Sequence, residues 1–402
     1  MITRPLVIAV IVSASAGFFG LSACSSGTSE LGSNRAIPDG GSDAEIGTDA
    51  ATDDAPSDDS ARRRPAPAAL ELVPNNGGPI IKSPQLVSVT WKTDDLAANL
   101  VAFDTWLPTS SFFTTMMAEW GVGAGSYGGA YSVDTAAPPM MDDAAVQALL
   151  TDAITLGKVP APNGSRIYMV YPPKGTIVQS FGTNGCSDFQ AYHGSFQYAG
   201  EGGIALAVYS VTPRCADTFG MTPTDFTTWG ASHEVMEASS DPDATKPTWV
   251  ILNQTPSTPQ PGENADLCGG HPTKVEGHMV TRNYSNVAAK AGARPCVPAP
   301  AGPMFGIYAS PTAVKIAPGT SIEVPVYAYA DGPLPAFTVT AYASTPALTV
   351  SLGVKTAAAG DTLTLKIAAS SAFTGAPGEN IVSLYASSNG YSVTRQLLAA
   401  RK

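Results

Sequence analysis

The chain has 402 residues and a formal net charge of −11, because its 33 acidic residues outnumber its 22 basic ones. Apart from Arg62, Arg63 and Arg64 the basic residues are scattered, so the sequence does not predict a nucleic-acid-binding protein. Part of the negative charge comes from aspartates in the low-complexity segment around these arginines, and the charge therefore indicates no particular partner.

The N-terminus has the features of a bacterial lipoprotein signal peptide. Arg4 precedes an apolar run at residues 5–21, and Leu21-Ser22-Ala23-Cys24 has the small residues and the cysteine of a lipoprotein cleavage site. The run is interrupted by serine and glycine, and it is shorter than the roughly 20 residues that a membrane-spanning helix needs. We therefore expect residues 1–23 to be cleaved, Cys24 to carry a lipid, and the protein to be anchored on the outside of a membrane of the cell envelope. In a bacterium with two membranes, Ser25 in place of an aspartate after the cysteine would favour the outer membrane, by analogy with known lipoprotein sorting.

Residues 24–70 predict a disordered acidic tether. They are rich in Ser, Gly, Asp, Ala and Pro and cannot bury enough apolar surface to offset the entropy of ordering. The remaining roughly 330 residues are too many for one comfortable core, so two domains are expected, at residues 71–300 and 303–402.

The four cysteines after Cys24 predict two disulfides, since an even number in an exported protein usually forms pairs. Three pairings are compatible with the sequence. We favour Cys186 with Cys215 and Cys268 with Cys296, because this pairing closes the shorter loops.

The first domain is expected to be α/β. Its alternating and apolar patterns predict strands at 85–91, 166–171 and 204–210, and helices at 94–106, 110–120, 142–156 and 223–239. Thr222 and Pro223 form a typical start for the last helix. Residues 243–300 are rich in Pro and Gly and predict an irregular, disulfide-braced region with one strand at 278–284.

The second domain is expected to be an all-β immunoglobulin-like sandwich. Seven short alternating segments, separated by turn residues, occupy 305–309, 321–330, 336–343, 348–352, 362–368, 380–386 and 392–397. Residues 303–402 contain neither His nor Cys, so we expect no catalytic or metal site in this domain and interpret it as a spacer or an adhesive module.

The predicted helix at 223–239 carries a metal-binding pattern. His233 and Glu237 are four residues apart and Asp241 is four further on, so a helix would stack them along one side, with Glu234 beside them. The pattern is that of an HExxH zinc helix in which glutamate replaces the second histidine, and zinc accepts carboxylate oxygen. The alternative is an exposed helix whose charges are simply solvated.

A zinc site needs a third ligand, and the sequence leaves the choice open among Asp241, Asp243, Glu263 and Asp266. With Glu234 as general base, the site would support hydrolysis, with a peptide bond as the expected target. The competing hypothesis is a non-enzymatic surface protein that binds polysaccharide, in which Ca²⁺ is held by Glu237, Asp241, Glu263 and Asp266. A serine hydrolase is disfavoured because no Gly-x-Ser-x-Gly elbow occurs, and the paired cysteines disfavour a cysteine hydrolase.

Residues 77–296 resemble the Exordium or phosphate-induced proteins of plant cell walls and their secreted bacterial relatives. The resemblance rests on Gly77-Gly78-Pro79, the segment from Cys186 to Tyr192-His193, residues 209–215, residues 233–237 with Asp241-Pro242, residues 263–268 and Tyr284-Ser285-Asn286. It implies an extracytoplasmic domain with a metal-binding HExxE helix. Independently of this family, the order of sheet strands, metal helix and loop-rich segment resembles the zincin arrangement.

The resemblance also raises His193 to a candidate ligand or transition-state donor, whereas its own surroundings in the sequence favour a structural role. The sequence departs from the family at Gln190-Ala191, where a Cys-Gly pair is expected, and at Asn283-Tyr284, where an aromatic pair or a tryptophan is expected. The remaining histidines, His271 and His278, are expected to be structural.

Overall fold

The structure is a computed structural model of the whole chain. It describes residues 72–180, 182–186, 189–200, 202–215, 221–252, 262–268, 272–299, 303, 305–330, 333–376, 380–388 and 391–402. The predicted signal peptide, the predicted lipidation site Cys24, the predicted tether and His271 lie outside these residues. Within the part of the chain that is described, no helix is long and apolar enough to cross a membrane.

A five-stranded sheet forms the centre of the first unit. Its strand order is β2-β1-β4-β8-β7, in which the first four strands run parallel and β7 pairs antiparallel with β8 at one edge. The bounds are β1 (Gln85–Trp91), β2 (Ser126–Val133), β4 (Arg166–Val170), β7 (Tyr192–Gly200) and β8 (Gly203–Val211).

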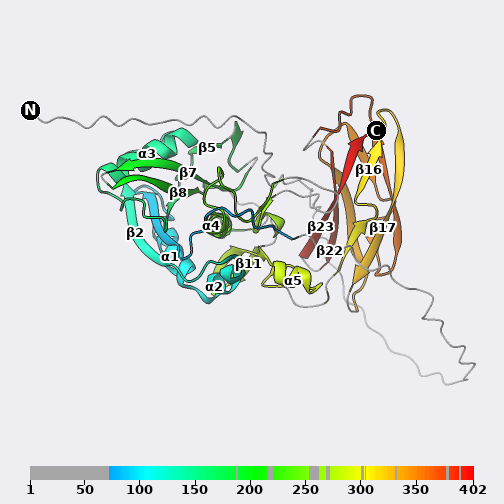
Figure 1. Cartoon of the computed structure of the whole chain (residues 1–402), viewed down its shortest axis with the longest axis horizontal. Coiled ribbons are helices and arrows are strands. Elements are labelled where there is room, and N and C mark those ends of the chain that lie inside the picture. Colours follow the sequence, from blue (N-terminus) through cyan, green and yellow to red (C-terminus); the bar gives the residue numbers. More distant parts are fainter. Residues whose placement is uncertain are drawn as a thin grey trace, which may run out of the picture.

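Helices cover both faces of this sheet, so the unit has three layers (Figure 1). Ile167 and Met169 of β4 join one core cluster with residues of α1, α2 and α4, whereas Tyr168 and Val170 join another with residues of α3. This alternation is what a strand buried on both faces requires. The helices are α1 (Ala97–Trp106), α2 (Ser111–Met117), α3 (Asp143–Thr155) and α4 (Pro223–Ser240).

Short elements complete the unit. After α4 the chain forms small antiparallel pairs, β9 with β10, β11 with β12 and β13 with β14, and β12 packs against α4. Their bounds, with those of the other short elements, are η1 (Leu107–Thr109), η2 (Ala118–Trp120), β3 (Met140–Asp142), β5 (Ile177–Ser180), β6 (Thr183–Asn184), β9 (Val250–Ile251), β10 (Gly262–Glu263), η3 (Asp266–Cys268), β11 (Pro272–Val275), β12 (His278–Thr281), β13 (Asn283–Tyr284), α5 (Asn286–Lys290) and β14 (Cys296–Val297).

The second unit is all-β and lies beside the first (Figure 1). Two sheets, ordered β15-β17-β21-β19 and β16-β23-β22-β18-β20, contribute to one apolar core that is separate from the cores of the first unit. The strands are β15 (Phe305–Ala309), β16 (Ala313–Ile316), β17 (Ser321–Ala330), β18 (Phe337–Ala343), β19 (Leu348–Ser351), β20 (Thr356–Ala357), β21 (Thr362–Ala369), β22 (Ile381–Ser388) and β23 (Tyr391–Arg401). The immunoglobulin-like topology stays a prediction.

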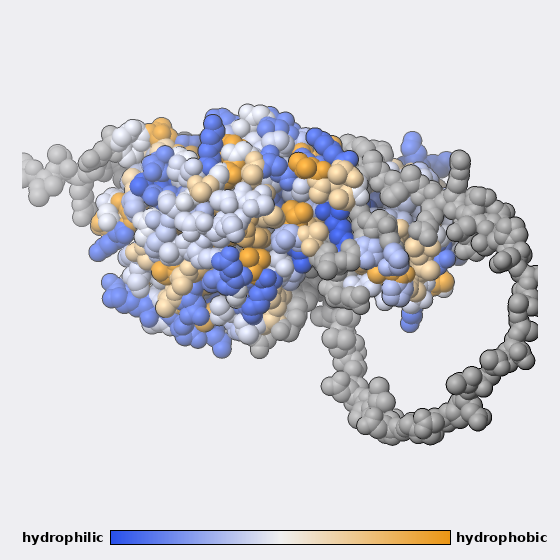
Figure 2. All heavy atoms as spheres, turned by 90° about the horizontal axis from the view of Figure 1, so that it is seen from below, coloured by the Kyte–Doolittle hydropathy of each residue, from blue (hydrophilic) through white to orange (hydrophobic). Residues whose placement is uncertain are grey.

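Both predicted disulfides are present, Cys186–Cys215 and Cys268–Cys296. They indicate an extracytoplasmic, oxidising compartment. Among the described residues on the face shown in Figure 2, apolar residues are scattered among polar ones.

Candidate metal centre

Helix α4 is the central element of the site, and it is buried rather than exposed. Thr222 caps its N-terminus, because the Thr222 Oγ1 accepts a hydrogen bond from the backbone N–H of Asp225 at 3.1 Å. The helix then runs between the sheet and the β12 hairpin, so that Glu234 and Glu237 are only 5% and 4% exposed. The alternative of a solvated surface helix is therefore wrong.

One group of metal-binding side chains forms at His233. Its Nε2 lies 3.1 Å from Oε1 of Glu237 and 3.3 Å from Oδ1 of Asp266. The backbone N–H of Asp266 donates a hydrogen bond to the same Oε1 at 2.9 Å. We call His233, Glu237 and Asp266 the His233 group.

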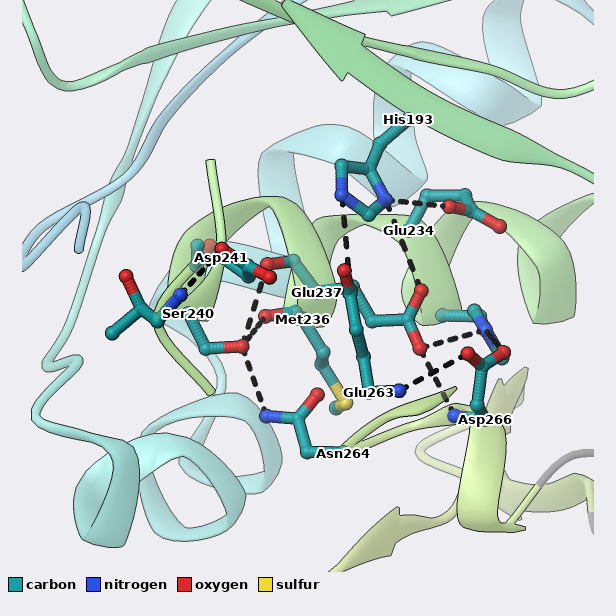
Figure 3. Close-up of polar contacts among 12 residues, drawn as sticks. His193, Glu234, Met236, Glu237, Ser240, Asp241, Glu263, Asn264 and Asp266 are labelled. Atoms are coloured by element: carbon teal, nitrogen blue, oxygen red, sulfur yellow. Dashed lines mark hydrogen bonds and ion pairs between the residues drawn. The ribbon is translucent and has the colours of Figure 1, made fainter. Parts of the chain in front are cut away.

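A second group forms at His193, which reaches α4 from the edge strand β7 (Figure 3). Its Nδ1 lies 3.1 Å from Oε2 of Glu234 and 3.8 Å from Oε2 of Glu237, while its Nε2 lies 3.7 Å from Oε2 of Glu263. We call His193, Glu237 and Glu263 the His193 group. Glu237 belongs to both groups and offers one oxygen to each.

The loop that carries Glu263 and Asp266 is fixed to α4. Asn264 Nδ2 donates a hydrogen bond to Oγ of Ser240 at 3.0 Å, and the disulfide from Cys268 to Cys296 closes the segment that follows. Gly262 starts the loop with a φ of +142°, and a Cβ there would lie 2.9 Å from Cβ of Asp266. Glycine is therefore required at this position.

The start of β7 is held close to α4 by another small residue. A Cβ on Gly230 would lie only 3.2 Å from Cγ of Gln190. Gln190 in turn donates from Nε2 to the carbonyl of Phe226 at 3.0 Å, and the Cys186–Cys215 disulfide links the segment before β7 to the residue four positions after β8. These contacts bring His193 to the helix.

Asp241 and Asp243 lie outside both groups. The α-helix ends at Ser240, and Asp241 has a non-helical backbone, so it leaves the line of His233 and Glu237 that a longer helix would have continued. Asp241 Oδ1 accepts a hydrogen bond from the N–H of Thr248 at 2.8 Å. Asp243 Oδ1 accepts from the N–H and the hydroxyl of Thr245, at 3.0 and 2.6 Å, and so caps its own turn.

The cluster concentrates negative charge away from water. Among the described residues, no lysine or arginine forms an ion pair with any of its five carboxylates, which belong to Glu234, Glu237, Asp241, Glu263 and Asp266. Burial, and then the neighbouring Asp266, raises the pKa of Glu237 to about 7. Burial and Glu237 likewise raise the pKa of Glu263 well above its usual value.

The pKa values of the two histidines are raised as well, although burial alone would lower them. Burial lowers the pKa of His193, but the hydrogen bond to Glu234 and the nearby carboxylates outweigh burial and bring it to about 8. The pKa of His233 is raised well above its usual value, because its carboxylate neighbours, Glu237 first, outweigh the lowering by burial. The cluster thus binds protons strongly, which is the behaviour of a site that favours cations.

Each group offers a metal one nitrogen and two oxygens whose ligand atoms lie within 4.8 Å of one another. Three protein ligands of this kind are typical of a catalytic zinc site, which keeps one position for water or substrate. Of the four residues that the sequence left open as the third ligand, two belong to these groups: Asp266 lies beside His233, and Glu263 lies beside His193. His278 is outside the cluster and stacks on Trp106 with ring centroids 4.4 Å apart, in agreement with a structural role.

Neither strand β7, which carries His193, nor the hydrogen bonds that hold the loop were predicted from the sequence. A signal for β7 was present, since Tyr192, Phe196 and Tyr198 alternate and pack into the core on the α3 side. No comparable local signal indicates that Ser240 binds Asn264. In comparisons with known proteins, no family model matches the chain and no curated protein matches it, so the Exordium resemblance stays a prediction.

Proposed function

We propose that this chain is a zinc-dependent hydrolase that acts outside the cytoplasm, with a peptide bond as its substrate. The observation that carries the proposal is the His233 group. Helix α4 supplies His233 and Glu237, and η3 supplies Asp266 at 3.3 Å from the His233 nitrogen. One nitrogen and two oxygens match a three-ligand zinc site.

Burial and charge support a cation at this place. Five carboxylates that share a poorly hydrated site with two imidazoles repel one another unless protons or metal ions compensate them. Held by the His233 group, zinc would supply this compensation and the chemistry of a Lewis acid that lowers the pKa of a water molecule.

Glu234 is the residue that we assign to proton transfer. It follows the ligand His233 directly in the sequence, and its Oε2 lies 3.1 Å from Nδ1 of His193. Its other oxygen points away from His193 (Figure 3). A carboxylate in this position can accept a proton from water and return it to the leaving group.

The abundance of carboxylates favours one alternative, a structural Ca²⁺ in a cell-surface protein that binds polysaccharide. Calcium takes six to eight oxygen ligands, and the cluster holds many carboxylate oxygens. Two imidazole rings within the same cluster favour zinc over calcium.

The envelope location forms part of the proposal. The lipoprotein signal predicts that a lipid on Cys24 anchors the chain to the outer membrane and that residues 24–70 act as the tether. In this arrangement the second unit is an immunoglobulin-like sandwich that serves as a spacer or adhesive module, and its sequence offers no His or Cys for chemistry.

The test is the metal content of the purified full-length protein, with hydrolysis of a broad peptide library measured on the same samples. We expect zinc to co-purify and to activate hydrolysis, and His233→Ala to lose both. His278→Ala is the matched control, because His278 lies outside the cluster, and it should keep both. If zinc is bound but no library peptide is cleaved, the peptidase assignment is wrong; calcium in its place would favour the binding-protein alternative.

A further inference from the structure

The carboxylate of Glu237 faces two sets of ligands (Figure 3). Its Oε1 lies 3.1 Å from His233 Nε2 and accepts the Asp266 N–H, whereas its Oε2 lies 3.8 Å from Nδ1 of the His193 ring. A carboxylate arranged in this way can bridge two metal ions, one on each oxygen. Two-metal hydrolytic sites hold their ions about 3.5 to 4 Å apart, a separation that such a bridge allows.

Glu263 provides an independent sign of a ligand on the His193 side. Its Oε2 is buried and has no hydrogen-bond partner among the described residues. The nearest imidazole nitrogen, His193 Nε2, is 3.7 Å away, which is too far for a hydrogen bond. Two atoms that coordinate one zinc in a tetrahedron are about 3.3 Å apart, so a small movement of either side chain would suit a shared cation.

The hydrogen bond to Glu234 selects the His193 nitrogen that remains available. The Glu234 carboxylate lies 3.1 Å from Nδ1, so in a neutral, metal-binding imidazole Nδ1 would carry the proton and Nε2 would be the free ligand nitrogen. A carboxylate partner on the other ring nitrogen is what orients most metal-binding histidines. Nε2 is also the nitrogen that faces Glu263.

The protein supplies little positive charge of its own to the cluster. Among the described residues, no lysine or arginine forms an ion pair with any of its five carboxylates. A second divalent cation would add positive charge where the chain offers only imidazole rings.

We propose that the centre binds two divalent cations bridged by Glu237, the second one held by His193 Nε2, Glu237 Oε2 and Glu263 Oε2. This inference rests on the proposed function, which places the first cation in the His233 group. The two ions would then lie on either side of the bridging carboxylate, with Glu234 beside the second.

The test is the zinc stoichiometry of the full-length protein. The protein is stripped with a chelator, reloaded with Zn²⁺, desalted and analysed by elemental mass spectrometry, and the fold of each variant is checked by circular dichroism. We expect two equivalents in the unchanged protein and one in His193→Ala, in Glu263→Gln and in His233→Ala. Glu237→Gln should hold less than one, and the control His278→Ala should hold two. Reloading with Mn²⁺ should give an electron paramagnetic resonance spectrum of a coupled pair, which is lost in Glu263→Gln.

The two proposals fail in different ways. One equivalent that His233→Ala removes and His193→Ala leaves intact would support the first cation and overturn the second. One equivalent that both histidine variants remove would mean a single cation shared by the two rings, and it would also overturn the second site. Zinc that His233→Ala does not reduce would contradict the proposed function itself. Glu263→Gln is close in size to the original residue, so its result stands even if an alanine variant is unstable.

Discussion

Removal of the Cys268–Cys296 disulfide should weaken both the fold and the metal centre. The two cysteines are 28 residues apart. Closing a loop of this length lowers the conformational entropy of the unfolded chain and so raises its free energy by about 3 to 4 kcal/mol. The loop that carries Glu263 and Asp266 ends at Cys268. We therefore expect Cys268→Ala with Cys296→Ala to lower the free energy of unfolding by about that amount, and the zinc affinity by roughly 10- to 100-fold.

The second disulfide supplies a matched control. Cys186 and Cys215 are 29 residues apart, so the double alanine variant should lose the same unfolding free energy, although its loop carries neither Glu263 nor Asp266. Urea unfolding is measured with chelator present, so that metal binding does not add to the stability of the folded state. Zinc affinity is measured separately by competition with a chromogenic chelator. An equal loss of affinity for the His233 group in both double variants would refute the link between the Cys268 disulfide and the ligand loop.

Three further predictions concern other parts of the chain. Glu234→Gln should keep the zinc but lower hydrolysis by roughly two or more orders of magnitude, because the amide cannot accept a proton; loss of the metal in this variant would make Glu234 a ligand instead. Burial raises the pKa of the Asp104 carboxyl from 3.8 to about 7, so the unfolded chain loses the carboxyl proton at a lower pH than the folded chain, and the free energy of unfolding should fall as the pH rises from 4 to 7. In urea titrations, Asp104→Asn should remove about 4 kcal/mol of that fall, and an unchanged pH dependence in this variant would show that Asp104 does not cause it. Cys24→Ser should release the protein from membranes in a fractionation experiment, and retention would count against the lipid anchor.

The sequence predicted the elements whose signals are local. Strands β1 and β17 have the predicted bounds, and α4 ends within one residue of its predicted end, because an alternating pattern or a Thr-Pro start needs no tertiary information. The helix predicted at 110–120 is α-helical only to Met117 and then tightens into η2. Strand β7 was missed because its glycines and serine weaken the strand signal, and pairing with β8 overrides that local preference.

In the candidate metal centre too, the residues that could be predicted are those whose positions depend on local structure. The four-residue spacing of His233 and Glu237 is a property of one helix, and it was sufficient to predict that they share a face. Asp241 shows the limit of that reasoning, because extrapolating the spacing requires the helix to continue, and it does not. His193, Glu263 and Asp266 are brought to α4 by an edge strand, a glycine turn and two disulfides, and such contacts between distant segments cannot be deduced from spacing.

The polar content of α4 argues that the helix has a role beyond packing. It lies between a sheet and a hairpin, where apolar side chains would fill the same volume without any cost of desolvation, yet it presents Glu234 and Glu237 to the interior. Buried carboxylates that repel one another destabilise the folded state, and ligand binding offsets this. A cation present at a hundred times its dissociation constant stabilises the fold by about 2.7 kcal/mol. Metal binding at this cluster would therefore be coupled to stability through Glu237, whose oxygens both lie within the cluster.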